Sequence, residues 1–188
     1  DGSHEEVVEM INVVTTNKTD FFREPMHFEY LFKAVLPEII RLKSQNCHKL
    51  NVWSAGCSTG EEPYTLAMVL SEIKDRYPQF DFFILATDIS TQVLDIARKG
   101  IYEMERIVPV PDPLKKKYLL KGKKSSNMFG MIRIIPELRK RIAFRRLNFM
   151  QSDFGLREPM DIIFCRNVII YFDKPTQQKI LMRFCEHL

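Results

Sequence analysis

The sequence lacks any long hydrophobic run. Among its 188 residues, no apolar stretch approaches the roughly 18 residues that a membrane-spanning helix requires. The first residues, Asp1 to Glu6, also lack the basic start and apolar segment of a secretion signal. We therefore expect a cytoplasmic protein. We interpret residues 1–14 as a tag remnant around Gly2-Ser3-His4 followed by a linker helix.

Cysteine, glycine and proline are all scarce, with 4, 7 and 10 copies respectively. The cysteines form no C-x-x-C pair and have no histidine at zinc-finger spacing, so the sequence predicts neither a metal site nor a redox motif. The low glycine and proline content excludes collagen and low-complexity disorder. The length fits roughly one globular domain with a small appendage.

Negative charge is nearly absent from one segment. Residues 115–146 carry twelve lysines and arginines and a single acidic residue, Glu137, so this segment has a charge of +11 within a chain whose net charge is +4. Such a concentration indicates either a solvated face or a surface that attracts an anionic partner. Gly122, Gly130 and the alternation at 131–134 predict short antiparallel strands rather than a helix. We expect a β subdomain inserted at about residues 115–141.

Elsewhere, strand patterns alternate with helix patterns. The almost continuously apolar run at 161–165 is typical of a strand that is buried on both faces. The alternation predicts an α/β fold with a doubly wound parallel sheet and right-handed crossovers. The predicted elements are a helix at 26–43 interrupted at Pro37, a strand at 50–54, a helix at 61–77, a strand at 80–87, a helix at 90–99 with Ser90 as N-cap, strands at 142–147 and 161–165, and a helix from Asp173.

A glycine-bearing turn follows the first predicted strand. Gly56 and Gly60 allow the backbone to approach a ligand beyond the carboxyl end of the sheet, where ligands of open α/β folds bind. Ser58 replaces the second glycine of the dinucleotide pattern, and the carboxylates of Glu61 and Glu62 would repel a pyrophosphate. The turn therefore favours a cationic ligand without phosphates. The alternative for the two glutamates is favourable capping of the helix dipole.

Asp88 ends the second predicted strand. A carboxylate at this position can accept hydrogen bonds from both ribose hydroxyls of a nucleoside, although an aspartate at a strand end is often only a cap. The glycine turn lies one strand earlier, as the nucleoside interpretation requires. Asp88, the turn and the acidic helix start together indicate the cationic nucleoside S-adenosylmethionine.

Four strings carry a resemblance to a known family. They are TNKTDFFRE at residues 16–24, WSAGCSTGEEPY at 53–64, ATDI at 86–89 and FCRNVIIYF at 164–172. With them the chain resembles the CheR-type chemotaxis protein-glutamate O-methyltransferases. The resemblance implies a Rossmann-like class I S-adenosylmethionine-dependent methyltransferase domain over residues 15–188. It also implies that the family's N-terminal helical domain and the last strands of its sheet are absent from this chain, which would leave an unpaired sheet edge.

The resemblance also implies roles for individual residues. Arg23 and Tyr171 would be catalytic and flank the transferred methyl group, and Glu62 and Asp88 would contact the cofactor and its ribose. The full predicted cofactor-binding set is Asn17, Thr19, Arg23, Gly56, Glu62, Asp88, Asn148, Phe149, Arg166 and Asn167. Among these, Asn17, Thr19 and Arg23 would form a loop over the active site, and Asn148 and Phe149 would border the adenine.

The function implied by the resemblance is methyl transfer from S-adenosylmethionine to glutamate carboxylates of chemoreceptors, with S-adenosylhomocysteine as product. The expected partners are the cytoplasmic helical region of a chemoreceptor and an acidic receptor segment at the basic β subdomain. We expect a monomer. We expect no binding of nucleic acid, because the chain lacks the Asn/Asp-Pro-Pro-Tyr/Phe string of amino-methylating enzymes. A signalling module that binds S-adenosylmethionine or S-adenosylhomocysteine without catalysis is the alternative.

Overall fold

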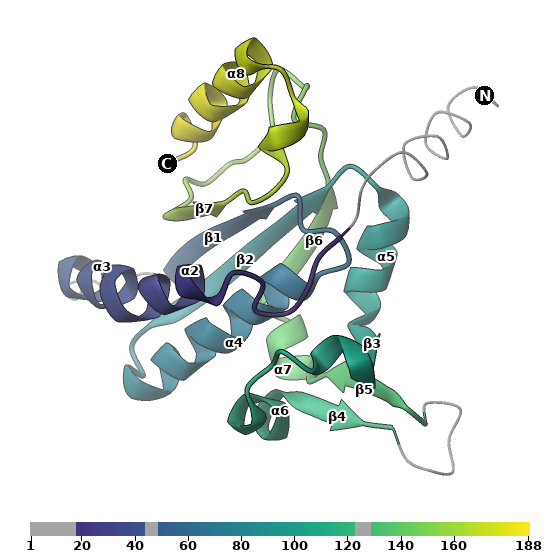
Figure 1. The fold of residues 1–188 in the computed structure, drawn as a ribbon. Helices are drawn as coiled ribbons and strands as arrows, with labels where there is room; N and C mark the ends of the chain where they lie inside the picture. The colour runs from purple at the N-terminus through teal and green to yellow at the C-terminus, as the bar shows by residue number, and fades with distance from the viewer. Residues whose placement is uncertain (1–17, 44–48, 123–128) are drawn as a thin grey trace.

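A parallel sheet of four strands forms the centre of the molecule (Figure 1). The computed structural model describes residues 18–43, 49–122 and 129–188. The strand order is β6-β2-β1-β7, so the chain moves outward from β1 first in one direction and then in the other. This confirms the predicted α/β fold with a doubly wound parallel sheet. The strands are β1 at Lys49–Ala55, β2 at Asp81–Asp88, β6 at Ile142–Arg146 and β7 at Ile162–Phe164.

The alternation of side chains along β1 and β2 gives the sheet two buried faces. Val52 and Ile84 belong to one hydrophobic cluster, whereas their sequence neighbours Trp53 and Leu85 belong to a second. Successive side chains of a strand point to opposite sides of a sheet. Helices therefore have to cover both sides, and the two clusters are the two halves of the core.

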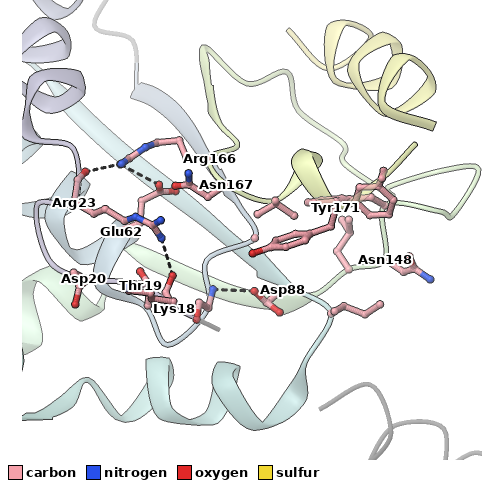
Figure 2. A pocket seen from close by; sticks show the side chains of 17 residues that line it. Lys18, Thr19, Asp20, Arg23, Glu62, Asp88, Asn148, Arg166, Asn167 and Tyr171 are labelled. Carbon is pink, nitrogen blue, oxygen red and sulfur yellow. Dashed lines mark hydrogen bonds and ion pairs between the residues drawn. The ribbon is translucent and has the colours of Figure 1, made fainter. Parts of the chain in front are cut away.

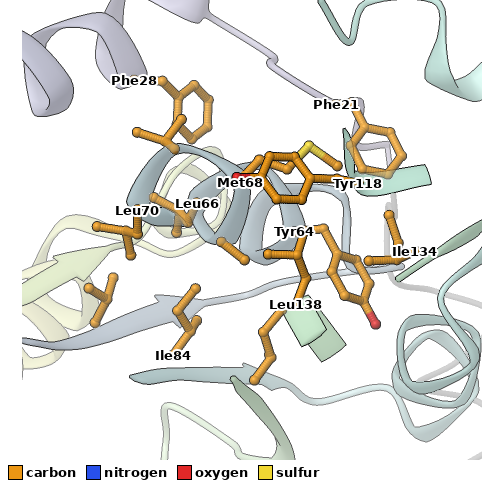
Figure 3. Packing of buried hydrophobic residues seen from close by; sticks show 14 of the residues in the cluster. Phe21, Phe28, Tyr64, Leu66, Met68, Leu70, Ile84, Tyr118, Ile134 and Leu138 are labelled. Carbon is orange, nitrogen blue, oxygen red and sulfur yellow. The ribbon is translucent and has the colours of Figure 1, made fainter. Parts of the chain in front are cut away.

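Helix α4 (Glu61–Arg76) covers the first face of the sheet. The first part of this helix is buried on almost all sides, and Tyr64, Leu66, Met68 and Leu70 are all inaccessible to solvent. Figure 3 shows these side chains among residues contributed by α2, by β2 and by the segment that follows α5. One helix thus joins three parts of the chain in a single core.

Aromatic rings fill the second face. Trp53 lies within 4.9–6.4 Å, centroid to centroid, of the rings of Phe149, Phe154 and Phe184. Its indole N–H donates a 2.9 Å hydrogen bond to Thr87, so no polar group of the ring is left unpaired in the core. Phe184 belongs to helix α8 (Lys174–Cys185), which this aromatic cluster holds against the sheet.

Local capping sets the ends of α5 (Thr91–Lys99) and the start of α8. The Ser90 side chain accepts a hydrogen bond from the amide of Val93, and Gly100 ends the helix at a φ of 59°. Asp173 accepts from the amide of Thr176 in the same way at the start of α8. The predicted starts of both helices are confirmed.

The first helical region runs through α2 (Pro25–Tyr30), a π-helical segment η1 (Leu31–Val35) and α3 (Leu36–Lys43). Pro37 lacks an amide hydrogen, so the α-helical bond it would otherwise make is missing. The wider turn immediately before it, closed by the Leu36 amide on the Leu31 carbonyl, is the form that the predicted interruption takes.

Residues 101–122 and 129–139, called the insertion below, contain a separate antiparallel sheet of order β3-β5-β4, and the subdomain bounds of about 115–141 stay a prediction. The prediction of strands rather than helix over the basic segment was wrong for Lys115 to Lys117, which lie in α6. Asp112 and Pro113 begin that helix, and both are favoured in a first helical turn. The insertion comprises β3 (Ile101–Glu103), the 3-10 helix η2 (Met104–Ile107), α6 (Asp112–Tyr118), β4 (Leu119–Lys121), β5 (Met131–Ile134) and α7 (Pro136–Arg139).

The strand β7 differs from its prediction. All three residues, Ile162 to Phe164, are only half-buried, whereas the apolar run predicted burial on both faces. Within the described residues β7 pairs with β1 alone and forms the edge of the sheet. A strand with one neighbour keeps part of its surface in solvent even when its sequence is apolar.

Some predictions fall outside the part of the chain that the structure describes. These concern residues 1–14, Asn17, Cys47, Lys123 and Lys124. Among the described helices, none is both long enough and apolar enough to cross a membrane. Within the same ranges, no three His, Cys, Asp or Glu side chains gather in a way that could hold a metal ion.

Substitutions in α8 test the aromatic cluster. Phe184→Ala should lower the free energy of unfolding by about 3–5 kcal/mol, because it removes a buried ring that packs on Trp53. Met182→Ala changes a side chain of the same helix that is 68% exposed, and it should stay within about 0.5 kcal/mol of wild type. Urea denaturation measures both variants. Equal losses in the two variants would contradict the packing of α8 described above.

Candidate functional site

A cavity of about 430 Å³ lies at the carboxyl ends of the parallel strands. Open α/β sheets bind ligands at this edge, beside the strand where the order reverses. Figure 2 shows Arg23, Glu62, Arg166 and Asn167 on one side of the pocket, Tyr171 and Asn148 on the other, and Asp88 between them. The volume is within the usual range for sites that take small molecules. The site residues predicted from the sequence that line it are Thr19, Arg23, Gly56, Glu62, Asp88, Asn148, Phe149, Arg166, Asn167 and Tyr171.

The turn between β1 and α4 brings backbone to the floor of the cavity. Gly56 has a φ of 85°, and a Cβ atom added there would lie 2.4 Å from a methyl carbon of Val168. The amides of Gly56 and Cys57 both donate to the Thr87 carbonyl, each at 2.8 Å. Only glycine fits this conformation and this close approach without strain. Backbone atoms of the turn, rather than a side chain at Gly56, therefore face the cavity.

Asp88 is held at the end of β2 by backbone amides. Its two carboxylate oxygens accept hydrogen bonds from Ser58 N at 2.8 Å and from Ser90 N at 3.0 Å. Burial raises the pKa of the Asp88 carboxyl above its ordinary value of 3.8, and the hydrogen bonds from these amides oppose that rise. The amides fix the carboxylate in one orientation toward the cavity.

Glu62 is the second carboxylate of the pocket, and its side chain is 13% exposed. One of its oxygens accepts from the Ser54 hydroxyl at 2.8 Å, and the other lies 3.4 Å from the Arg166 guanidinium. Burial raises the pKa of the Glu62 carboxyl above 4.5, against opposing contributions from the Ser54 hydrogen bond and the charge of Arg166. A charged group kept out of water in this way favours a positively charged ligand.

Arg166 joins this carboxylate to the loop formed by residues 18–24. Its guanidinium donates to the Arg23 carbonyl at 2.5 Å and to the Glu24 carboxylate at 3.0 Å, and it lies 5.2 Å from the ring centroid of Phe28. The hydrogen bond from Arg166 lowers the pKa of Glu24. Within the described part of the chain, the buried Nε atom of Arg166 has no hydrogen-bond partner, so the hydrogen bonds of this side chain come from its terminal nitrogens.

The loop of residues 18–24 closes one side of the cavity. Its Arg23 side chain donates to the Lys18 carbonyl at 2.8 Å, and the Phe22 amide donates to the Thr65 hydroxyl at 3.2 Å. Phe22 and Glu24 have φ values of 53° and 54°, a left-handed conformation that is uncommon outside glycine. Such strain persists only where surrounding contacts enforce it and is frequent at functional sites.

The opposite side of the cavity is more apolar. Phe149 is buried within the aromatic cluster and also lines the pocket, so the cluster fixes its position. The side-chain oxygen of Asn148, Oδ1, accepts from the Met150 amide at 2.9 Å, which anchors the turn after β6. Tyr171 lines the pocket from the 3-10 helix η3 (Ile169–Tyr171) and remains 64% exposed. This ring therefore lies at the mouth rather than at the floor.

The structure thus brings all but one of the predicted site residues around a single cavity. Asn17 lies outside the described residues, and the individual roles of the others stay predictions. Sequence reasoning missed further lining residues, among them Lys18, Asp20, Ser58 and Val168. All four lie inside the strings that carried the resemblance. Their position inside these strings was the signal that could have identified these residues.

The pH dependence of stability tests the burial of Glu62. Because its folded pKa lies above its unfolded value, wild-type protein loses stability as pH rises through the folded pKa. Glu62→Gln does not titrate, so its free energy of unfolding should increase relative to wild type between about pH 4 and about pH 7. Urea denaturation at several pH values measures the difference in unfolding free energy between the two proteins. The change of this difference with pH does not depend on any pH-independent effect of the substitution.

A control with the opposite sign is available at the surface. The exposed Glu38 has a pKa that its hydrogen bond to Arg41 lowers. Glu38→Gln should therefore lose stability relative to wild type as pH rises toward the unfolded value of 4.5, and the difference should not change further above that pH. A difference between wild type and Glu62→Gln that does not change with pH would contradict the raised pKa.

Comparison with known proteins shows what the chain is similar to. Residues 17–188 match the family described as CheR methyltransferase, SAM binding domain. The chain is 43% identical over 173 residues to chemotaxis protein methyltransferase 2 of Pseudomonas aeruginosa, covering 92% of this chain and 59% of that protein. It is 42% identical over 186 residues to the chemotaxis protein methyltransferase of Borreliella burgdorferi, covering 97% and 64%. The corresponding Escherichia coli protein is 40% identical over 174 residues, covering 93% and 57%.

The chain therefore spans less than two thirds of the length of these relatives. The family match extends over nearly the whole chain, including every described residue. It also includes the loop, the glycine turn and the strand ends that form the cavity. The chain belongs to the family of CheR methyltransferase SAM-binding domains.

Proposed function

We propose that this domain binds S-adenosylmethionine and takes part in methylating glutamate side chains of chemoreceptors, which yields a glutamate methyl ester and S-adenosylhomocysteine. The observation that carries the proposal is the cavity itself, where the half-buried carboxylates of Glu62 and Asp88 face a loop that bears Arg23. The choice of receptor as substrate is supported by the relatives, which are named chemotaxis protein methyltransferases.

The residues present fit the proposed cofactor. Each carboxylate oxygen has two acceptor sites, so Asp88 can still accept from ribose hydroxyls after binding the amides of Ser58 and Ser90. The buried carboxylate of Glu62 suits the positively charged amino group at the methionine end. Phe149 offers an aromatic ring beside Asn148 for the adenine. When bound, S-adenosylmethionine supplies an electrophilic methyl group on a positively charged sulfonium.

The protein needs little acid–base chemistry for this reaction. A glutamate with an ordinary pKa of about 4.3 is already ionised at neutral pH, so no general base is required. Neither of the described histidines, His27 and His187, lines the cavity. The chain instead provides orientation and exclusion of water. Correct orientation of two reactants is worth about 7–11 kcal/mol in well-organised cases.

Arg23 and Tyr171 are the residues that we assign to the acceptor side. The Arg23 guanidinium holds the Lys18 carbonyl through one nitrogen and has further donors that can clamp an incoming carboxylate. Tyr171 lies at the mouth, where its exposed ring can contact both reactants. A carboxylate entering the cavity would meet these two side chains from opposite sides (Figure 2).

The insertion offers a second surface for the receptor. Much of its positive charge is used internally: Lys117 pairs with Glu72 and Asp75 of α4, and the adjoining Arg141 pairs with Asp81 of β2. Among the described residues of the insertion, Lys116, Lys121 and Arg133 are exposed besides Lys117, and the adjoining Lys140 is exposed as well. We assign an acidic receptor segment to this surface on grounds of charge complementarity.

The chemistry of the product tests the proposed function. The protein is incubated with a chemoreceptor cytoplasmic fragment and S-adenosylmethionine labelled in the methyl group. A carboxyl methyl ester releases its label as volatile methanol in mild base, whereas a methylated amine keeps it. We expect base-labile label that disappears when the methylated glutamates are replaced by glutamine. Base-stable label would contradict the assignment, and binding of cofactor without transfer would favour the non-catalytic signalling module.

Replacing Arg23 separates the roles of binding and turnover. In Arg23→Ala, turnover at saturating cofactor should fall by about 100-fold or more, because the carboxylate loses its clamp. The affinity for S-adenosylhomocysteine should change by less than about fivefold. Initial rates and calorimetry measure the two effects. Unchanged turnover in a folded variant would overturn the role of Arg23.

A further inference from the structure

One side chain of the insertion reaches across to the loop of residues 18–24. Arg106 lies in η2, and its guanidinium donates to the Thr19 carbonyl at 2.9 Å and lies 3.8 Å from the Asp20 carboxylate. The same nitrogen that binds the Thr19 carbonyl also pairs with the carboxylate of Glu61 at the start of α4. Arg106 therefore joins three parts of the chain that are far apart in the sequence.

Glu61 is completely buried, whereas Arg106 is half-buried. The second oxygen of Glu61 accepts from the Thr59 hydroxyl at 2.6 Å, so both oxygens of this carboxylate have partners. A buried carboxylate whose cation is removed is strongly destabilising. Glu61 therefore fixes Arg106, whose shared nitrogen also holds the loop at the Thr19 carbonyl while its other terminal nitrogen faces Asp20.

Tyr102 of the insertion supports the same junction. Its hydroxyl donates to the Thr59 carbonyl at 2.7 Å, and its ring meets the buried ring of Phe21 edge-on at 5.0 Å. Phe21 belongs to the loop and is inaccessible to solvent. The insertion thus contacts the loop at Phe21 through packing and at Thr19 and Asp20 through Arg106.

We propose that Arg106 is a positioning residue that holds the Lys18–Glu24 loop against the cavity, so that the insertion determines the geometry of the cofactor site. Arg106 does not line the cavity, and its effect passes through the backbone of Thr19 and the side chain of Asp20. Arg166 holds the other end of the same loop at Arg23 and Glu24. The statement about the cofactor rests on the proposed function, whereas the statement about the loop does not.

Arg106→Lys distinguishes this role from a general contribution to stability. A lysine keeps the charge that Glu61 requires but has a compact ammonium in place of the planar fork that reaches several acceptors at once. Hydrogen exchange measured by mass spectrometry over residues 18–24 reports opening of the loop. The amides of Phe22 and Arg23, which bond to Thr65 and Asp20, should exchange at least about tenfold faster in the variant.

Lys117→Met is the matched control. Lys117 also joins the insertion to α4, through Glu72 and Asp75, but it does not touch the loop. Exchange over residues 18–24 should stay at the wild-type rate in this variant. Equal acceleration in both variants would overturn the proposal, because it would mean that loosening the insertion anywhere releases the loop. Unchanged exchange in Arg106→Lys would also overturn it.

A second variant covers the case in which Arg106→Lys does not fold. Arg106→Met combined with Glu61→Gln removes both charges and leaves no buried ion unpaired, and the same acceleration confined to residues 18–24 is expected. Calorimetry with S-adenosylhomocysteine then tests the link to the cofactor. We expect an affinity at least about fivefold weaker in the loop-opening variants and unchanged in Lys117→Met.

The two sets of results separate the two ideas. A loop that opens without any change in affinity would overturn the link to the cofactor site. A wild-type protein that does not bind S-adenosylhomocysteine would refute the proposed function instead, and the exchange rates would still decide whether Arg106 holds the loop.

Discussion

Two half-buried carboxylates, Asp88 and Glu62, constrain most of the structure around them at one edge of the sheet. Removing an ion from water costs several kcal/mol unless hydrogen bonds and opposite charge compensate. Asp88 obtains this compensation from the amides of Ser58 and Ser90, and Glu62 obtains it from Ser54 and Arg166. The glycine turn between β1 and α4 places the Ser58 amide beside Asp88 and leads into the helix that carries Glu62. The cavity is the space that remains in front of the two groups.

Arginines from two distant segments complete the site by fastening the loop of residues 18–24 at both ends. Arg166 follows β7 and Arg106 belongs to the insertion, so the loop depends on the parallel sheet at one end and on the antiparallel sheet at the other. The insertion therefore has a structural role in holding this loop, apart from any partner that its exposed basic side chains attract. It also explains how a loop with two left-handed non-glycine residues keeps one conformation.

The sequence predicted much of this architecture because the relevant signals are local. Short apolar runs located β1 and β2, and the caps Ser90 and Asp173 located the starts of α5 and α8. The contacts of Arg106 were not predictable in this way, because its acceptors lie 45 and 87 positions away along the chain. No local sequence pattern distinguishes this arginine from the others. The exposure of β7 depends on which strands lie beside it, and composition alone does not contain that information. The helix over Lys115 to Lys117 had a local signal in Asp112 and Pro113, which the weight of basic residues obscured.

Calorimetric titration of wild type and Asp88→Ala with S-adenosylhomocysteine tests the central claim, which is that the carboxylates of Asp88 and Glu62 form a cofactor site. Asp161→Ala is the control, because Asp161 also accepts a backbone amide, from Asn51, and does not line the cavity. We predict micromolar binding that is weakened at least about tenfold in Asp88→Ala and unchanged in Asp161→Ala. Wild-type affinity in a folded Asp88→Ala protein, or no binding by folded wild-type protein, would contradict the account.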